Sequence, residues 1–297
     1  DPVLCSRFTR TADASSDSWS LLAGSVLPLS DSVHTVKLIS SASTPTRVAI
    51  TPGIGYLVQP GGGGGYQWIS DTGVRYGIDT EAEGDKAAQE IAGKYGANSA
   101  MCVTCDVSKE DQVKALMDKT VERFGKIDIL VNNAALFAPL HHTKVQDIDV
   151  DLWDKVFAIN VRGSFLTVKH AVPHMIAKKY GKIVNIGSGT VYKGLPGMLH
   201  YTASKGAIAT FTRTLSRELG EHGICVNTLS PGLVMSETLV ATGTHDAALQ
   251  ARVVGSRAFK RDQFPPDLIG ALVFLSSAES DFVTGQTIAV DGGSVNT

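Results

Sequence analysis

The chain has 297 residues, which is enough for one large α/β domain with a sizeable core. Its hydrophobic content of 43% and charged content of 19% are ordinary for a soluble globular protein, and a net charge of −2 gives no reason to expect nucleic-acid or membrane-surface binding. No apolar run approaches the ~18 residues of a membrane span, and four cysteines are too few for a disulfide framework.

The first 45 residues differ from the rest in composition. They are rich in serine and threonine and lack sustained periodicity, apart from the short apolar run LLAGSVLPL (21–29). A targeting segment is one interpretation, but a disordered or artefactual extension explains the pattern better. We therefore expect the folded domain to span 46–297 and the protein to be cytoplasmic.

From residue 47 onward, strand-like and helix-like segments alternate. The strand-like segments are short and rich in β-branched residues, at 47–51, 66–70, 99–107, 126–134, 182–188, 224–232 and 286–293. The helix-like segments lie at 81–96, 108–124, 152–178, with Pro173 interrupting the last turns, 201–221 and 266–277. This alternation predicts an α/β fold, a single doubly wound Rossmann-type domain whose parallel sheet carries helices on both faces. Ligands of such sheets bind at the carboxyl ends of the strands.

The segment YTASKGA (201–207) carries the first chemical signal. Tyr201 and Lys205 are four residues apart, so a helix places them on one face. A free tyrosine has a pKa of about 10, and a neighbouring lysine cation would lower it toward usable acid–base chemistry. The pair alone also fits a solvated helix face. It gains weight from Ser188, a hydroxyl at the end of a predicted strand, and from Asn160, a polar residue inside an apolar helical stretch.

Together with NNAA (132–135), SPG (230–232) and TGQTIAVDGG (284–293), these residues resemble the short-chain dehydrogenase/reductase family. The similarity runs from about residue 48 to 293 and is imperfect in its first quarter. The resemblance implies a seven-stranded parallel sheet, a nicotinamide cofactor, and oxidation of an alcohol or reduction of a carbonyl. It also implies a homotetramer or homodimer, built through the helices that carry Asn160 and Tyr201 and through the last strand.

The resemblance assigns a role to each catalytic residue. Tyr201 would give a proton to the carbonyl oxygen, or remove it from the alcohol, while Ser188 hydrogen-bonds the same oxygen. Lys205 would tune Tyr201 and bond the nicotinamide ribose, and Asn160 would hold a water that connects Lys205 to solvent. The residues implied to bind the cofactor, besides Tyr201 and Lys205, are Gly53, Ile54, Gly55, Asp71, Asp106, Val107, Asn132, Ala134, Pro231, Gly232, Val234 and Ser236.

Three of these have specific partners in the implied complex. Asp106 would bond the adenine amino group, and Ser236, in place of the usual threonine, would bond the carboxamide. Asp71 ends the predicted second strand, where an acidic residue accepts both ribose hydroxyls and favours NAD over NADP. Arg75 lies close enough in sequence to leave NADP open.

The segment TPGIGYLVQPGGGGGYQ (51–67) departs from the family pattern. Family members carry TGxxxGxG and then a helix whose N-terminus stabilises the pyrophosphate. Here only GIG (53–55) remains. An internal proline costs a helix about 3 kcal/mol and each glycine about 1 kcal/mol, so Pro60 and the five glycines at 61–65 disrupt the first crossover helix. We favour a frame or sequence error here over a genuine pyrophosphate-binding loop or a loss of cofactor binding.

No metal site is expected, because the Cys102–Cys105 pair lacks a second pair of ligands and fits small buried hydrophobes on a strand. The predicted substrate lid, at about 236–266, is mixed and partly apolar, without a strong arginine cluster. We therefore expect a small to medium, largely apolar secondary alcohol or ketone as substrate. A 3-oxoacyl thioester is the alternative within the enzyme class. A non-catalytic scaffold is the rival from another class, and the four retained catalytic residues argue against it.

Overall fold

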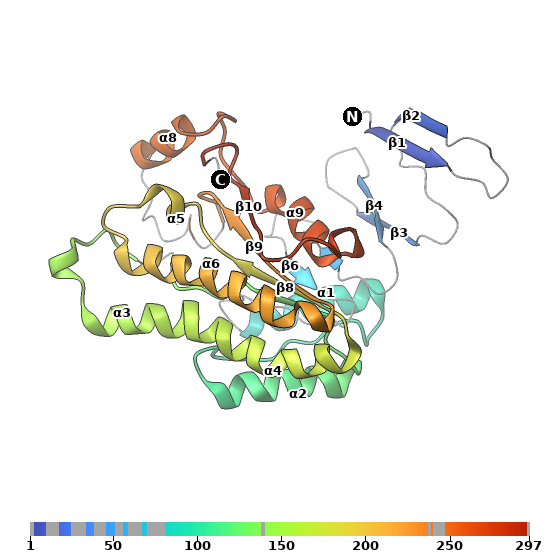
Figure 1. Cartoon of the computed structure of the whole chain (residues 1–297), viewed down its shortest axis with the longest axis horizontal. Coiled ribbons are helices and arrows are strands. Elements are labelled where there is room, and N and C mark those ends of the chain that lie inside the picture. Colours follow the sequence, from blue (N-terminus) through green and yellow to red (C-terminus); the bar gives the residue numbers. More distant parts are fainter. Residues whose placement is uncertain are drawn as a thin grey trace. The chain divides into compact units, whose positions relative to one another are not determined.

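The computed structural model divides into two compact units, Asp1–Gly53 and Ile54–Thr297 (Figure 1). The described residues are 3–9, 18–24, 34–38, 46–50, 56–58, 67–69, 81–137, 140–236, 239 and 247–295.

The first unit contains two antiparallel strand pairs. β1 (Val3–Thr9) pairs with β2 (Ser18–Gly24), and β3 (His34–Leu38) pairs with β4 (Thr46–Ile50). β4 coincides with the strand expected at 47–51, but its expected place in a parallel sheet was wrong, because a short connection favours a hairpin over a parallel crossover. The expectation that residues 1–45 are a disordered or artefactual extension stays a prediction.

The second unit is built on a parallel sheet, which confirms the predicted α/β fold. Among the described residues its strand order is β10-β9-β8-β7. The strands are β7 (Ile129–Asn132), β8 (Gly181–Ile186), β9 (Ile224–Pro231) and β10 (Thr287–Val290). β7, β8 and β9 lead at their carboxyl ends into NNAA, Ser188 and SPG, so the topology gathers the predicted chemistry at one edge of the sheet.

The other expected strands of this sheet behave differently. β5 (Tyr56–Val58) and β6 (Gln67–Ile69) flank residues 59–66 and pair antiparallel with each other. The segment at 99–107 is irregular apart from a bridge residue at Met101, so the strand expected there was wrong. In a doubly wound sheet the third strand pairs with the second. The expected second strand, at 66–70, contains β6, and β6 pairs with β5 instead, so the segment at 99–107 lacks its expected neighbour. The described sheet therefore has four parallel strands rather than the seven implied.

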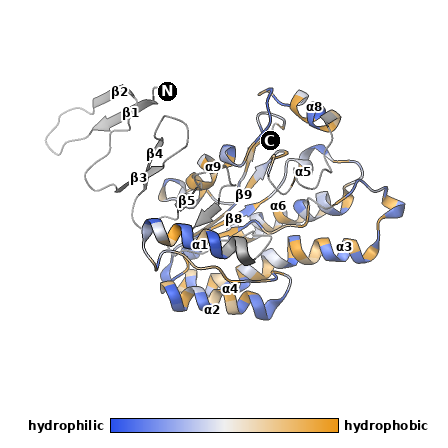
Figure 2. Cartoon of the chain, turned by 180° about the vertical axis from the view of Figure 1, so that it is seen from behind, coloured by the Kyte–Doolittle hydropathy of each residue, from blue (hydrophilic) through white to orange (hydrophobic). Residues whose placement is uncertain are grey.

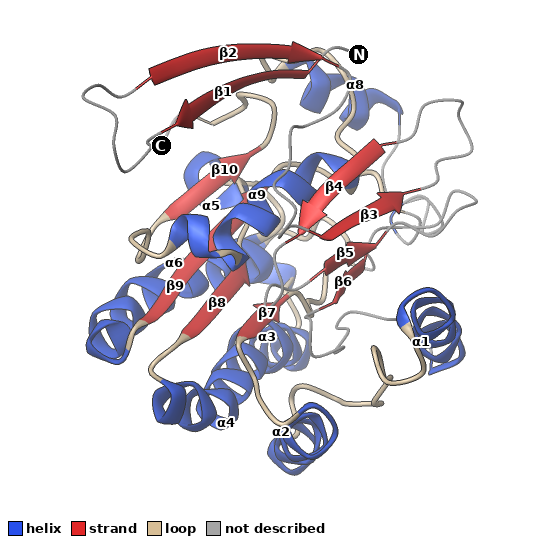
Figure 3. Ribbon diagram, turned by 90° about the vertical axis from the view of Figure 1, so that its right-hand side faces the viewer, coloured by secondary structure: helices blue, strands red, loops and turns tan. Residues whose placement is uncertain are grey.

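Helices cover both faces of this sheet (Figure 3). The core on one face is supplied by α2 (Glu110–Phe124), α4 (Gly163–Lys178) and α6 (Leu199–Leu219), and the core on the other face by α9 (Pro266–Ser276). Figure 2 shows hydrophilic and hydrophobic residues interleaved along α2, whose Val113, Leu116 and Met117 are buried. The helices outside the 150–178 region are α1 (Glu81–Tyr95), α2 (Glu110–Phe124), α5 (Thr190–Lys193), α6 (Leu199–Leu219), α8 (Ala247–Gly255) and α9 (Pro266–Ser276), with short 3-10 turns at Val145–Asp147, Gly220–His222 and Ala278–Ser280. None of the described helices has both the length and the apolar character needed to span a bilayer.

The long helical region expected at 152–178 is divided at Asn160. α3 (Val150–Phe157) leads into a π-helical turn (Ala158–Arg162), which leads into α4 (Gly163–Lys178). Pro173 stays inside α4, so the interruption expected at the proline was wrong. Single π turns inside helices are frequent at functional sites, and here the turn carries Asn160.

Candidate active site

Three of the four predicted catalytic residues meet where β8 ends and α6 begins. Ser188 lies two residues beyond β8, and Tyr201 and Lys205 lie one turn apart near the start of α6. The Ser188 hydroxyl lies close enough to that of Tyr201 to lower the pKa of the tyrosine. The Lys205 Nζ atom lies 5.9 Å from the centroid of the Tyr201 ring.

Burial controls the pKa of Tyr201. The residue is only 7% exposed, and loss of solvent raises its pKa to about 12, while the nearby Ser188 hydroxyl acts in the opposite direction. The expected lowering of this pKa was therefore wrong for the protein alone, because desolvation of the phenolate is the largest influence on it and raises it. Tyr201 is a protonated phenol at neutral pH, ready to donate a proton.

Lys205 is held beneath the tyrosine by the backbone of β8. Its Nζ atom donates a hydrogen bond to the carbonyl oxygen of Ile186 at 2.7 Å. The side chain is 4% exposed, and burial lowers its pKa to about 8. The ammonium carries three donors, so the bond to Ile186 leaves donors for a further acceptor at this position.

Thr190 prepares Ser188 to donate a hydrogen bond, a contribution that the sequence analysis missed. The Ser188 Oγ atom accepts from the Thr190 backbone N at 3.3 Å and from the Thr190 Oγ1 at 3.0 Å. An oxygen whose lone pairs accept these bonds presents its own proton elsewhere. A hydroxyl two residues after a strand-end serine is the sequence signal that was available.

Asn160 uses its side-chain amide to fix the loop that follows β7. The Oδ1 atom accepts from Leu136 N at 2.7 Å, and Nδ2 donates to Leu136 O at 3.3 Å and to Ser204 Oγ at 3.0 Å. Ser204 in turn donates to the carbonyl oxygen of Tyr201 at 2.7 Å. Asn160 therefore connects the NNAA loop to the tyrosine helix, and its expected role in holding a water stays a prediction.

A pocket lies at the end predicted for adenosine. Val107, Asn132 and Ala134 line it together with residues of the π turn and α4. The Asn132 side chain is fixed by protein groups, since Nδ2 donates to Asn185 Oδ1 at 2.9 Å and Oδ1 accepts from Thr167 at 2.6 Å. The pocket wall is therefore held in one conformation before any ligand enters.

Asp106 is exposed beside this pocket wall and is stabilised as a carboxylate. Its Oδ1 atom accepts from the backbone N and from the hydroxyl of Ser108, at 2.9 and 2.7 Å. These two bonds are the main causes that lower the pKa of Asp106. An ionised, exposed carboxylate can accept from an amino group such as that of adenine.

The loop after β9 holds the residues predicted for the nicotinamide end. Gly232 N donates to Val290 O at 3.2 Å, and Val234 forms a bridge with Gln263. Ser236 N donates to Val234 O at 2.9 Å, and the Ser236 hydroxyl accepts from Leu239 N at 3.3 Å. The predicted residues of this segment thus lie in one short, internally bonded loop.

These two ends fit the implied dinucleotide cofactor. The Asp106 carboxylate, which accepts hydrogen bonds, suits the adenine amino group, and the buried Lys205 ammonium with donors to spare suits a ribose next to Tyr201. The residues expected to hold the pyrophosphate and the adenosine ribose lie outside the described residues: Gly53, Ile54, Gly55 and Asp71.

Comparison with known protein families gives one match over three quarters of the chain. Residues 74–295 match the family described as Enoyl-(Acyl carrier protein) reductase. A second match, to the family described as Type VII secretion system ESX-1, transport TM domain B, covers residues 1–102, about a third of the chain. The first match begins after the glycine run, so it covers every predicted catalytic residue and leaves out the GIG remnant.

Individual relatives agree with the larger match. A (+)-borneol dehydrogenase 2 of Salvia officinalis is 37% identical over 223 residues, which cover 72% of this chain and 78% of that protein. A 3-oxoacyl-[acyl-carrier-protein] reductase of Thermotoga maritima is 35% identical over 193 residues, 64% of this chain and 75% of that protein. The crystal structure of a gluconate 5-dehydrogenase from Burkholderia cenocepacia, in complex with NADP and tartrate, has a TM-score of 0.67 and 32% identity, covering 72% of this chain and 82% of that one.

Proposed function

The chain belongs to the short-chain dehydrogenase/reductase family of NAD(P)-dependent oxidoreductases, and from this premise we propose that it interconverts a small to medium, largely apolar secondary alcohol and its ketone. The borneol dehydrogenase among its relatives supports this substrate class. Homodimer or homotetramer assembly remains a prediction of the family resemblance, and a cytoplasmic location remains a prediction from the sequence of the first 45 residues.

One observation carries the substrate proposal: the side chains packed around Tyr201 are apolar. The Phe137 ring centroid lies 4.7 Å from that of Tyr201, with the planes at 40°. Leu136, Leu152 and Leu195 are the other partly exposed members of this cluster and can face a ligand, whereas Leu140, Val156 and Met198 are buried behind them. A polyhydroxylated acid would leave its hydroxyls unpaired against such a surface, at a cost of about 1–3 kcal/mol for each. An apolar ketone would bury its carbon skeleton there favourably.

Three of the four predicted catalytic residues would each take a step in ketone reduction. A bound nicotinamide would supply the hydride. The Tyr201 hydroxyl, with its pKa raised to about 12, is protonated and gives its proton to the carbonyl oxygen as negative charge develops there. Ser188 donates a hydrogen bond to the same oxygen, since Thr190 occupies its acceptor side. The buried Lys205 ammonium then stabilises the phenolate that remains.

We propose NAD as the preferred cofactor, because Asp71 ends the predicted second strand. Asp71 lies outside the described residues, and the similar Burkholderia structure contains NADP. Titration of the purified chain with NADH and with NADPH, followed by nicotinamide fluorescence, tests this preference. Tighter binding of NADPH would refute it, and no binding of either at millimolar concentration would favour the non-catalytic scaffold.

Substrate class is tested with a panel under both cofactors: a bicyclic secondary alcohol, a sugar acid and a 3-oxoacyl thioester. We expect the highest kcat/KM for the bicyclic alcohol or its ketone. A higher value for the thioester would support the alternative, which the Thermotoga relative favours. Tyr201→Phe should lower kcat by about 10²–10⁴-fold and leave cofactor binding largely intact. Tyr95→Phe, on the half-exposed end of α1, is the matched control. Unchanged turnover in Tyr201→Phe would refute the mechanism.

A further inference from the structure

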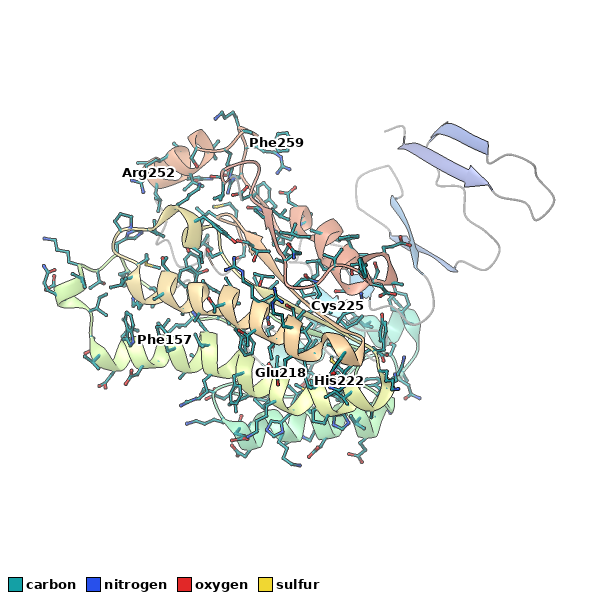
Figure 4. The ribbon with its side chains drawn as sticks, viewed as in Figure 1. Phe157, Glu218, His222, Cys225, Arg252 and Phe259 are labelled. Atoms are coloured by element: carbon teal, nitrogen blue, oxygen red, sulfur yellow. The ribbon has the colours of Figure 1, made fainter. Side chains whose placement is uncertain are left out.

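Arg257 is a buried cation that the proposed mechanism does not use. It follows α8 at the return of the predicted lid, and in the chain it lies between Arg252 and Phe259, both labelled in Figure 4. Its exposed fraction is only 3%, although arginine is almost never buried without partners. Its guanidinium donates to two backbone carbonyl oxygens, from Nη2 to Leu233 at 2.7 Å and from Nη1 to Arg261 at 2.9 Å.

The bond to Leu233 reaches the loop at the nicotinamide end of the site. Leu233 lies between Gly232 and Val234, two of the residues predicted to contact the cofactor. Arginine presents its donors in a rigid planar fork, so holding two carbonyls at once fixes the distance between their segments. Here the two segments are those of Leu233, just before the predicted lid, and of Arg261, near its C-terminal end.

A third segment, the end of β10, lies against the same loop after β9. A Cβ atom placed on Gly232 would lie 2.8 Å from Gln263 Oε1, 3.1 Å from Asp291 Cβ and 3.3 Å from Arg257 Nη2. Gln263 also donates from Nε2 to Val290 O at 2.6 Å, the same oxygen that accepts from Gly232 N at 3.2 Å. The loop is therefore enclosed by polar side chains from two other segments, and Arg257 is the charged one that bonds it directly.

We propose that Arg257 is a positioning residue, whose guanidinium holds Leu233 O and thereby sets Val234 and Ser236 against the nicotinamide ring. The inference rests on the proposed function, because the nicotinamide is the group that this loop would receive. Arg257 does not touch the reacting atoms; it acts through the loop. Removing it should release the loop and remove the nicotinamide contribution to binding, while leaving the adenosine pocket intact.

The first test uses the protein without cofactor. In Arg257→Met, which keeps the bulk of the side chain and removes its donors, amide exchange in a fragment covering 232–236 should rise at least tenfold. The amides of Gly232, Met235 and Ser236 are all hydrogen-bonded in that fragment, so the rise is measurable. Exchange within β8 should stay unchanged. An unchanged exchange rate in 232–236 would overturn the proposal, as would an equal rise across the whole sheet.

The second test compares NADH with ADP-ribose, which lacks the nicotinamide. The wild-type protein should bind NADH more tightly than ADP-ribose. In Arg257→Met the ratio of the two dissociation constants should approach one, while the dissociation constant of ADP-ribose changes less than twofold. Arg257→Lys, which keeps a donor, should recover part of the ratio and serves if the methionine variant does not fold. Equal weakening of both ligands would indicate a merely structural role and would overturn the proposal.

Arg261 provides the matched control. Its side chain is 57% exposed, and its guanidinium bonds Asp267 at 2.7 Å and the carbonyl oxygen of Asp262 rather than Leu233 O. Arg261→Met should therefore change neither the exchange of 232–236 nor the ratio. If the wild-type protein binds neither NADH nor NADPH, the proposed function fails and the nicotinamide role of Arg257 fails with it, whereas the exchange experiment still shows whether the bond to Leu233 orders the loop.

Discussion

Replacing Lys205 with methionine should change how the stability of the protein depends on pH. Burial lowers the pKa of Lys205 from its ordinary 10.5 to about 8. Between these values the unfolded chain binds more protons than the native protein, so the free energy of unfolding rises with pH. Below pH 8 the lysine is charged in both states, and the native state bears the full cost of the buried charge.

The difference between the two pKa values corresponds to about 3 kcal/mol. Between about pH 7 and pH 9.5 the native protein should recover about 2 kcal/mol of this cost. Tyr201 acts in the opposite direction, because its pKa is raised to about 12, but only above about pH 10. Burial also raises the pKa of Cys105 above 9.0, and its effect is the same in both proteins, so it cancels in the comparison.

The measurement is urea unfolding of the cofactor-free protein at both pH values. The free energy of unfolding of the wild-type protein should rise by about 2 kcal/mol relative to Lys205→Met. Lys119→Met, at an exposed position on α2, should instead follow the wild-type protein. If wild type and Lys205→Met stay parallel to within about 0.5 kcal/mol, the ammonium is solvated in solution, and the reasoning from burial is refuted.

Two further substitutions test the supports of the site. Asn160→Leu removes three hydrogen bonds, including both to the backbone of Leu136. We expect the free energy of unfolding, measured in urea, to fall by about 3 kcal/mol, and kcat to fall with it. An unchanged free energy of unfolding would contradict this. Gly163→Ala places a Cβ atom 2.7 Å from Val107 Cγ2, and both residues line the pocket at the end predicted for adenosine. The substitution should weaken NADH binding about tenfold in a fluorescence titration. Gly206→Ala is the control, because a Cβ atom at Gly206 has no neighbour within 4 Å, and it should leave the affinity unchanged. Equal affinities in the two variants would place the adenosine elsewhere.

The relative placement of the catalytic side chains could be predicted from the sequence because it depends on local geometry. Four residues make about one helical turn, so Tyr201 and Lys205 share a face. A parallel sheet brings strand ends together, so Ser188 joins them. The protonation behaviour of Tyr201 could not be predicted in this way, since the direction of its pKa depends on burial by residues such as Phe137, which only the folded chain brings near.

The pairing of the strands also could not be predicted from local sequence patterns. β-branched runs correctly indicated strands at β4 and β6, but hydrophobic pattern does not say which edge a strand will join. In this chain each pairs with a neighbour close in sequence, β3 and β5, because short loops cost little entropy to close. The group formed by Gly232, Arg257, Gln263 and Asp291 could not be predicted for a related reason, since these residues come from three segments that are distant in sequence.

The hydrogen bonds at the two ends of the predicted lid fix where that segment begins and ends, so its sequence can be replaced separately from the rest of the domain. Leu233 is tied to Arg257, and Met235 N donates to Gln263 O at 2.8 Å, so the chain leaves the sheet and returns to it at the same place. Lengthening a loop whose ends are fixed costs only about 0.6 kcal/mol for each doubling. A library that varies 237–255 and keeps both tied ends could therefore exchange one substrate for another without rebuilding the sheet or moving the catalytic tyrosine.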